Sequence, residues 1–264
     1  MQRLIACLNV ACLAGVCAVI APPALAQSSP SASTPDFSGV YYPVQQGRGG
    51  GRGQRAGGPP AGTPARPTQS APVSDGSQGR SPDAPALTPE YMAKWEVIRK
   101  SRMSGSYEYD NNAKCLPPGM PAMMNMAYGM EVMQTKDKIT FFSELNDALR
   151  RVYLDGRKPT QKHLEDTTYA GYSTGHWEGD TLVVETVALH PDSFIEGFSP
   201  HSDQMVVRER IRLVGPGLLE DRITVTDPKA LTKPWETVRT YRKASKGNDE
   251  LREFACAEGL TREK

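Results

Sequence analysis

Alternating apolar and polar residues dominate the chain after about residue 129 and predict extended strands. The runs are short, rich in β-branched and aromatic residues, and bounded by Gly, Pro, Asn or Asp, as is typical of strands joined by tight turns. We expect strands at residues 37–42, 131–134, 139–145, 149–154, two within 171–187, 205–213, 219–226, 237–242 and 251–256. The pattern therefore predicts a mainly β protein, an antiparallel meander of about ten strands closed or nearly closed into a barrel, because closure removes exposed edges.

One helix is expected ahead of the main run of strands. Thr88 stands at an N-cap position, Pro89 at the first helical position, and Glu90 in the first turn. Apolar residues then recur at three- and four-residue spacing to about Arg102, which is typical of a helix packed on a larger body. Residues 111–128 are irregular and rich in Cys, Pro and Met, and we expect them to form a plug packed on the fold.

Residues 171–187 have the pattern of a β-hairpin. The turn falls at Glu178-Gly179-Asp180, and a β-branched run follows it. The same stretch contains Gly171-x-Ser173-x-Gly175, which matches the nucleophile elbow of serine hydrolases. An elbow needs a helix after the serine and a parallel sheet with helical crossovers. Neither is predicted here, so the hairpin interpretation is preferred to the hydrolase one.

Strict alternation identifies charged residues that face the predicted interior. On residues 205–213 the apolar set includes Glu209, and on residues 219–225 it includes Asp221. Leu149, Arg151 and Tyr153 are assigned to the interior by the same argument. A buried carboxylate must be paired or become neutral, so Glu209, Asp221 and Arg151 are expected to form a polar layer. This layer is either a satisfied structural network or the polar part of a ligand cavity.

The N-terminus has the features of an export signal. Arg3 precedes an apolar run at residues 4–20, and Ala24-Leu25-Ala26 is a small-x-small cleavage site. The run is too short for a membrane span. We expect cleavage after Ala26 and a periplasmic or secreted bacterial protein without stable membrane insertion. Cleavage removes three of the five cysteines, and the remaining pair, Cys115 and Cys256, predicts a disulfide, with free thiols or a metal pair as the alternatives.

The organisation along the chain follows from composition. Residues 1–26 are the signal, 27–44 a leader with the first strand, 45–86 an insert rich in Gly, Arg, Pro, Ser and Gln, and 87–260 the helix, plug and barrel. The insert has too little apolar surface to order itself and is predicted to be disordered. Its segment 47–53 resembles an arginine-glycine RNA-binding segment, but a solvated insert is preferred in an exported chain. Acidic and basic residues nearly balance, so no field toward nucleic acid is expected.

Metal sites have weak support in the sequence. His163, His176, His190 and His201 lack metal-ligand spacing. Six methionines within residues 120–133 are interpreted as packing, with ligand-pocket lining or a thioether copper site as alternatives. No cofactor is expected.

Several motifs together resemble a family of exported bacterial proteins of unassigned function. They are Cys115-Leu116-Pro117-Pro118-Gly119-Met120-Pro121, Arg151-x-Tyr153-x-Asp155-Gly156-Arg157, Trp177-Glu178-Gly179-Asp180-Thr181-Leu182-Val183-Val184, His201-Ser202, Asp227-Pro228 and Lys233-Pro234-Trp235. The resemblance implies export and a β-rich domain, and carries over no catalytic residue. Phe37-Ser38-Gly39-Val40-Tyr41 also resembles the opening strand of lipocalin-like barrels, with Tyr41 where those usually have Trp.

Three functions remain open on the sequence. The first is binding of a small apolar or amphipathic molecule in the barrel, with contacts from Arg151, Tyr153, Trp177, Glu209 and Asp221. The second is a periplasmic isomerase, lyase or hydrolase with Glu209 or Asp221 as general acid or base and His201 as a partner at the barrel mouth. The third is a structural envelope protein whose insert tethers partners.

Overall fold

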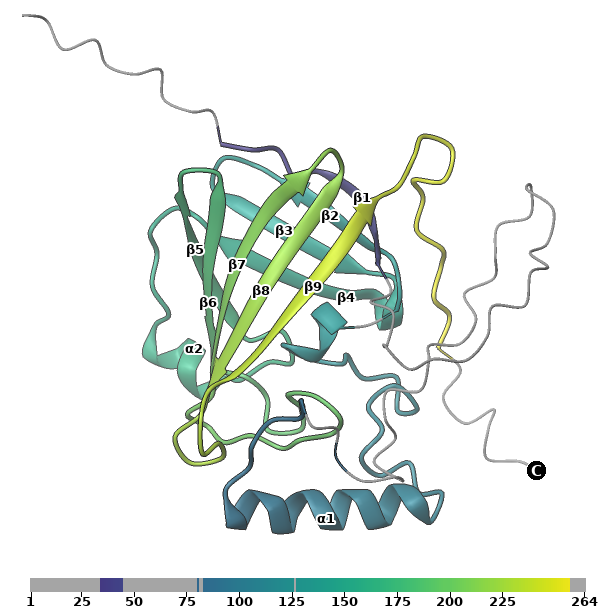
Figure 1. The fold of residues 1–264 in the computed structure, drawn as a ribbon, viewed down its shortest axis with the longest axis vertical. Coiled ribbons are helices and arrows are strands. Elements are labelled where there is room, and N and C mark those ends of the chain that lie inside the picture. The colour runs from purple at the N-terminus through teal and green to yellow at the C-terminus, as the bar shows by residue number, and fades with distance from the viewer. Residues whose placement is uncertain (1–33, 45–79, 81–82, 126, 257–264) are drawn as a thin grey trace, which may run out of the picture. The chain divides into compact units, whose positions relative to one another are not determined.

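The computed structural model describes residues 34–44, 80, 83–125 and 127–256. The predicted signal, most of the 27–44 leader before its strand, and nearly all of the 45–86 insert lie outside these residues. The described part contains two α-helices, α1 (Pro89–Met103) and α2 (Gln161–Glu165), and nine strands (Figure 1). The strands are β1 (Gly39–Pro43), β2 (Met130–Gln134), β3 (Lys138–Ser143), β4 (Ala148–Tyr153), β5 (Tyr172–Glu178), β6 (Thr181–Val187), β7 (Val206–Gly215), β8 (Leu218–Thr226) and β9 (Trp235–Lys243).

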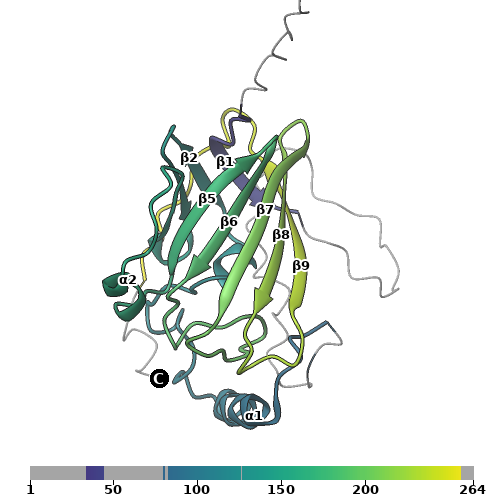
Figure 2. The ribbon, with the colours of Figure 1, turned by 90° about the vertical axis from the view of Figure 1, so that its left-hand side faces the viewer.

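The nine strands form a closed barrel in which each strand pairs with its neighbours in sequence. Closure is made by β1, which pairs with β9 through Tyr42 and Arg242 and with β2 on its other side. Figures 1 and 2 show the strands wrapping around a common interior from two perpendicular directions. The prediction of a mainly β, closed barrel is confirmed.

The strand directions and the strand count differ from the prediction in two places. All neighbouring pairs are antiparallel except β4 and β5, which run parallel through Val152 and Ser173. Two parallel neighbours need a connection that returns the chain to the end of the barrel at which the first of them begins. The segment that contains α2 makes this connection between β4 and β5. Residues 251–256, predicted as a tenth strand, have no regular secondary structure and pair with no strand of the described chain. Because β1 already occupies the free edge of β9, the barrel has no edge left for them.

The predicted helix and hairpin are both present. α1 begins at Pro89 after Thr88, although the Thr88 hydroxyl donates to the carbonyl of Lys229, 3.0 Å away, and caps no helical amide. The helix lies across one end of the barrel in both views (Figures 1 and 2). It buries Tyr91, Trp95 and Ile98. The hairpin is formed by β5 and β6, and its turn contains Gly179 at a φ of 63°.

The methionine-rich segment packs against the barrel as a plug. A short 3₁₀ helix (Ala122–Asn125) buries Met123 and Met124, and Met120 is fully buried before it. These residues and Met130 belong to the hydrophobic core, which confirms the packing interpretation for them. Met133 is 40% exposed on β2, and Met126 lies outside the described residues. The methionines therefore do not converge as one group.

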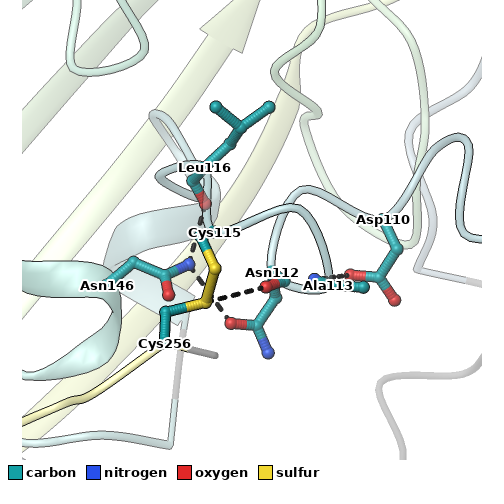
Figure 3. The surroundings of a disulfide bond; sticks show 7 residues. All are labelled: Asp110, Asn112, Ala113, Cys115, Leu116, Asn146 and Cys256. Carbon is teal, nitrogen blue, oxygen red and sulfur yellow. Dashed lines mark hydrogen bonds between the residues drawn. A yellow bond between two sulfur atoms is a disulfide. The ribbon is translucent and has the colours of Figure 1, made fainter. Parts of the chain in front are cut away.

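A disulfide joins Cys115 in this plug segment to Cys256, 141 positions further along the chain (Figure 3). The predicted pairing is confirmed, but Cys256 lies beyond the closing strand and not on it. Beside the bond, the side-chain amide of Asn146 donates to the carbonyl of Leu116 over 2.8 Å. The disulfide therefore fastens the end of the described chain to the plug, at a point where Asn146 also holds the plug to the β3–β4 connection.

Candidate functional site

An ion pair lies wholly inside the barrel, between Arg150 on β4 and Glu209 on β7. The contact is bidentate: Nη1 of Arg150 lies 2.8 Å from Oε1 of Glu209, and Nη2 contacts Oε2. Nε of Arg150 donates to the Ser173 hydroxyl over 3.2 Å, and Nη2 also donates to the Thr186 hydroxyl over 3.0 Å. Charges removed from water are tolerated when they are paired and hydrogen-bonded in this way.

Alternation explains why Glu209 and Asp221 face inward, as predicted. On β7, Val207, Glu209 and Ile211 are fully buried, whereas the residues between them are exposed. On β8, Asp221 has an exposed fraction of 0% and lies opposite Ile211 in the antiparallel register. Register is strongly specified here because a shift by one position would bring a row of arginines into the core.

The prediction that Arg151 and Tyr153 face the interior is wrong. On β4 the buried residues are Ala148, Arg150 and Val152, and Arg151 is exposed. The 3₁₀ turn Leu145–Asp147, with Asn146 and Asp147 at positive φ, leads into β4. The even-numbered residues of the strand therefore face inward, and the odd-numbered ones, which were predicted to do so, face outward. Leu149 consequently lies on the outer surface. Arg150, which the sequence argument missed, takes the place assigned to Arg151.

Tyr153 belongs to a group of rings on the outside of the barrel. Its ring centroid lies 5.4 Å from that of Tyr172, and the guanidinium of Arg157 lies 4.2 Å from it. Trp177 is half-buried and tilts against Phe37 with 5.1 Å between the ring centroids. Trp177 packs on the core, but neither aromatic residue is hydrogen-bonded to the buried ion pair in the described chain.

Asp221 is the unusual member of the interior. Burial raises the pKa of its carboxyl well above the ordinary value, and the negative charge of Glu209 raises this pKa further. Arg150 and Arg239 act in the opposite direction but do not cancel the effect. Neither carboxyl oxygen has a hydrogen-bond partner in the described structure as a carboxylate. In its protonated form, the group gains a hydrogen that it can donate toward Glu209, which favours the neutral acid.

Two residues of β9 complete the polar interior. Arg239 lies opposite Asp221 in the register, and its Nη2 reaches Oε2 of Glu196 over 3.4 Å. Tyr241 is buried, and its hydroxyl donates to the carbonyl of Met124 in the plug. Burial raises the pKa of Tyr241 well above its ordinary value, so the phenol stays neutral. A sequence pattern could have predicted both residues. Arg239 and Tyr241 alternate in phase with Trp235 and Thr237, so they are expected on the same face of the strand.

His201 is not part of this interior group. It is buried in a loop, where Nε2 lies 2.8 Å from the Ser193 hydroxyl and Nδ1 lies 2.8 Å from the carbonyl oxygen of Ser202. Burial lowers the pKa of its imidazole, which favours the neutral ring. Asp227 holds the same loop by accepting from the Ser202 amide and hydroxyl, each at 2.6 Å. The contacts of His201 are those of a loop residue, and it does not meet the predicted partner carboxylates.

Ser173 lies in a strand and not at an elbow. It is fully buried on β5, which continues to Glu178 without a helix, and its hydroxyl lies 2.8 Å from that of Thr186. The hydroxyl also accepts from Arg150, so it serves the ion pair. Among the described residues, no three His, Cys, Asp or Glu side chains are grouped to hold a metal ion. That grouping does not include thioethers, so copper binding by methionine stays an untested alternative to packing.

The fold and these contacts define a closed nine-stranded β-barrel with a charged, hydrogen-bonded interior. No family model matches the chain, and no curated protein matches it. Among the helices of the described ranges, none is long and apolar enough to cross a membrane.

Proposed function

We propose that this chain is an exported β-barrel protein that binds a small amphipathic molecule inside the barrel. The apolar part of the ligand would lie among the inward side chains of the strands, and its polar end would meet the carboxyl of Asp221. Export is supported by the N-terminal residue pattern and by the disulfide, since disulfides persist mainly outside the cytosol.

The single observation that carries the proposal is the state of Asp221. Its side chain is fully buried, yet neither oxygen has a protein partner as a carboxylate. A buried oxygen that accepts no hydrogen bond costs about 1–3 kcal/mol, even where the neutral acid donates toward Glu209, so folded proteins rarely retain one without a use. A ligand that hydrogen-bonds this carboxyl would recover that free energy on binding.

The neighbouring ion pair has a different role. Arg150 already donates to Glu209, Ser173 and Thr186, and both oxygens of Glu209 are engaged. These groups are satisfied within the protein, so they have little left to offer a ligand. We assign them to holding the strands and the local charge in place, which leaves Asp221 as the carboxyl available for recognition.

Native mass spectrometry of protein purified from the exported fraction of its own cells tests the binding function. We expect a species heavier than the polypeptide, which returns to the polypeptide mass on denaturation. The Asp221→Asn variant should retain less of this ligand, whereas Asp203→Asn, the same change on an exposed carboxylate, should retain it. A wild-type protein that carries nothing and binds no small amphipathic molecule would contradict the proposal.

A second candidate is an enzyme that uses the same carboxyl. Because burial raises the pKa of Asp221, the group keeps its proton to a higher pH than an ordinary carboxyl does, which suits a general acid. Loss of turnover of the retained molecule in Asp221→Asn, with binding and fold preserved, would favour an isomerase, lyase or hydrolase. Binding without turnover in the wild type would favour the first function.

A further inference from the structure

The charges of the barrel interior pair off and leave one acid without a cation. Arg150 is neutralised by Glu209, and Arg239 reaches Glu196 at the margin of the interior. Asp221 has neither an ion pair nor a hydrogen bond as a carboxylate in the described structure. The groups facing it are Glu209 from β7, Arg150 from β4, and Arg239 and Tyr241 from β9. Ionisation of Asp221 would therefore leave an unbalanced negative charge in a buried site.

We propose that the ligand of this barrel carries a basic amine, and that its ammonium group takes the place of the proton on Asp221. This inference rests on the proposed binding function and specifies the polar end of the ligand. When an already protonated amine enters, the proton of Asp221 passes to the solvent. The carboxylate of Asp221 and the ammonium then form an ion pair inside the barrel.

A cation suits this site better than an anion does. The carboxylate of Glu209 lies close enough to Asp221 to affect its ionisation, so a bound anion would meet negative charge from two strands. The donors of Arg150 are already directed at Glu209, Ser173 and Thr186. The one competing feature is Nε of Arg239, a buried donor without a hydrogen-bond partner in the described ranges, which would suit a carboxylate ligand.

Three probes with the same alkyl chain separate these possibilities: octylamine, 1-octanol and octanoate. Calorimetric titration at neutral pH, in two buffers with different ionisation enthalpies, measures affinity and proton release together. We expect octylamine to bind the wild-type protein about tenfold or more tightly than 1-octanol, because charge-assisted hydrogen bonds are stronger than neutral ones. Octylamine binding should release protons, up to one per molecule bound, and 1-octanol binding should release none.

The Asp221→Asn variant should lose both the preference for octylamine and the proton release, while its affinity for 1-octanol is kept. Asp203→Asn should behave as the wild type does. If Asp221→Asn fails to fold, the pH dependence of the wild type alone decides: octylamine affinity should rise with pH as the competing proton is lost, up to the pKa of the amine.

Each other outcome has a definite meaning. Equal binding of octylamine and 1-octanol without proton release would overturn the amine assignment and leave the binding function standing. Preference for octanoate would also overturn it and point to Arg239. Failure of all three probes, together with an absent retained ligand, would contradict the binding function itself.

Discussion

Arg150 and Glu209 form a bidentate ion pair across the inside of the barrel, between strands that are not neighbours. Two strands, β5 and β6, separate β4 from β7 in the sheet. Each intervening strand contributes a hydroxyl to the guanidinium, Ser173 from β5 and Thr186 from β6. One side chain thus links four consecutive strands, including the parallel β4–β5 pair, whose register spans only two residue pairs.

Glu209→Gln should strongly destabilise the fold, because it leaves the guanidinium of Arg150 buried without a counterion. Breaking a buried pair by changing one partner typically costs about 3–5 kcal/mol. Urea unfolding at neutral pH measures this loss. Glu185→Gln is the matched control, since Glu185 pairs with Arg208 on the outer surface over 2.8 Å. Exposed pairs contribute about 0–1 kcal/mol, so similar losses in both variants would rule out a structural role for the inner pair.

Asp221→Asn should change the pH dependence of stability. The folded pKa of Asp221 is raised, so at a pH between the unfolded pKa of about 4 and the folded pKa the native state binds more protons. Stability contributed by this group is therefore complete below the unfolded pKa and falls as pH rises toward the folded pKa, by up to about 1.4 kcal/mol per pH unit. Unfolding curves measured across pH should show that, as pH rises, the free energy of unfolding of the wild type falls relative to that of the variant. Parallel curves would show that Asp221 is not protonated in the native state.

Replacing Cys115 and Cys256 together by Ser should lower stability, by no more than about 5 kcal/mol for a loop of 141 positions. Because residues 245–256 belong to no strand among the described residues, the loss should be local first. Hydrogen exchange should increase in residues 245–256 and in the plug before it increases in the strands. Labelling of both thiols in unreduced native protein would refute the disulfide.

Gly171→Ala should destabilise the hairpin more than Gly156→Ala does. Both glycines have positive φ, 67° and 78°, which costs an alanine about 1–2 kcal/mol. At Gly171 the added Cβ would also lie 2.7 Å from the carbonyl oxygen of Val187, whereas nothing lies within 4 Å at Gly156. Overpacking adds about 1–3 kcal/mol at the first site. Thermal or urea unfolding of the two variants gives the comparison, and equal losses would contradict the close packing at Gly171.

The sequence was most informative where alternation was unbroken. On β7, apolar residues alternate with Arg208, Arg210 and Arg212, so only one phase can be buried, and Glu209 must go inside. On β4, Leu149-Arg150-Arg151-Val152 has an arginine and an apolar residue in either phase. Local pattern could not choose between them there. The choice is made by the turn before the strand and by the partner carboxylate on β7, which is 59 positions away.

The local sequence pattern could not predict which strands pair with each other. Residues 251–256 were predicted as a strand, yet the edge of β9 that they would need is taken by β1. The parallel entry of β5 depends on the path of the α2 connection, whose helix is only five residues long. Which buried carboxyl lacks a donor likewise depends on four strands at once, and so the contrast between Glu209 and Asp221 emerged only from the assembled barrel.

The pairing of β1 with β9 has a consequence for the order of events as the chain is made. Tyr41 on β1 lies opposite Lys243 on β9. Strand β1 therefore cannot pair with β9 until nearly the whole polypeptide has been synthesised. Such distant pairings slow folding. The barrel cannot close while the ribosome is still producing β9. Completion of the barrel is therefore a late step in the folding of this chain, even though β2 to β8 each pair with a strand that precedes them.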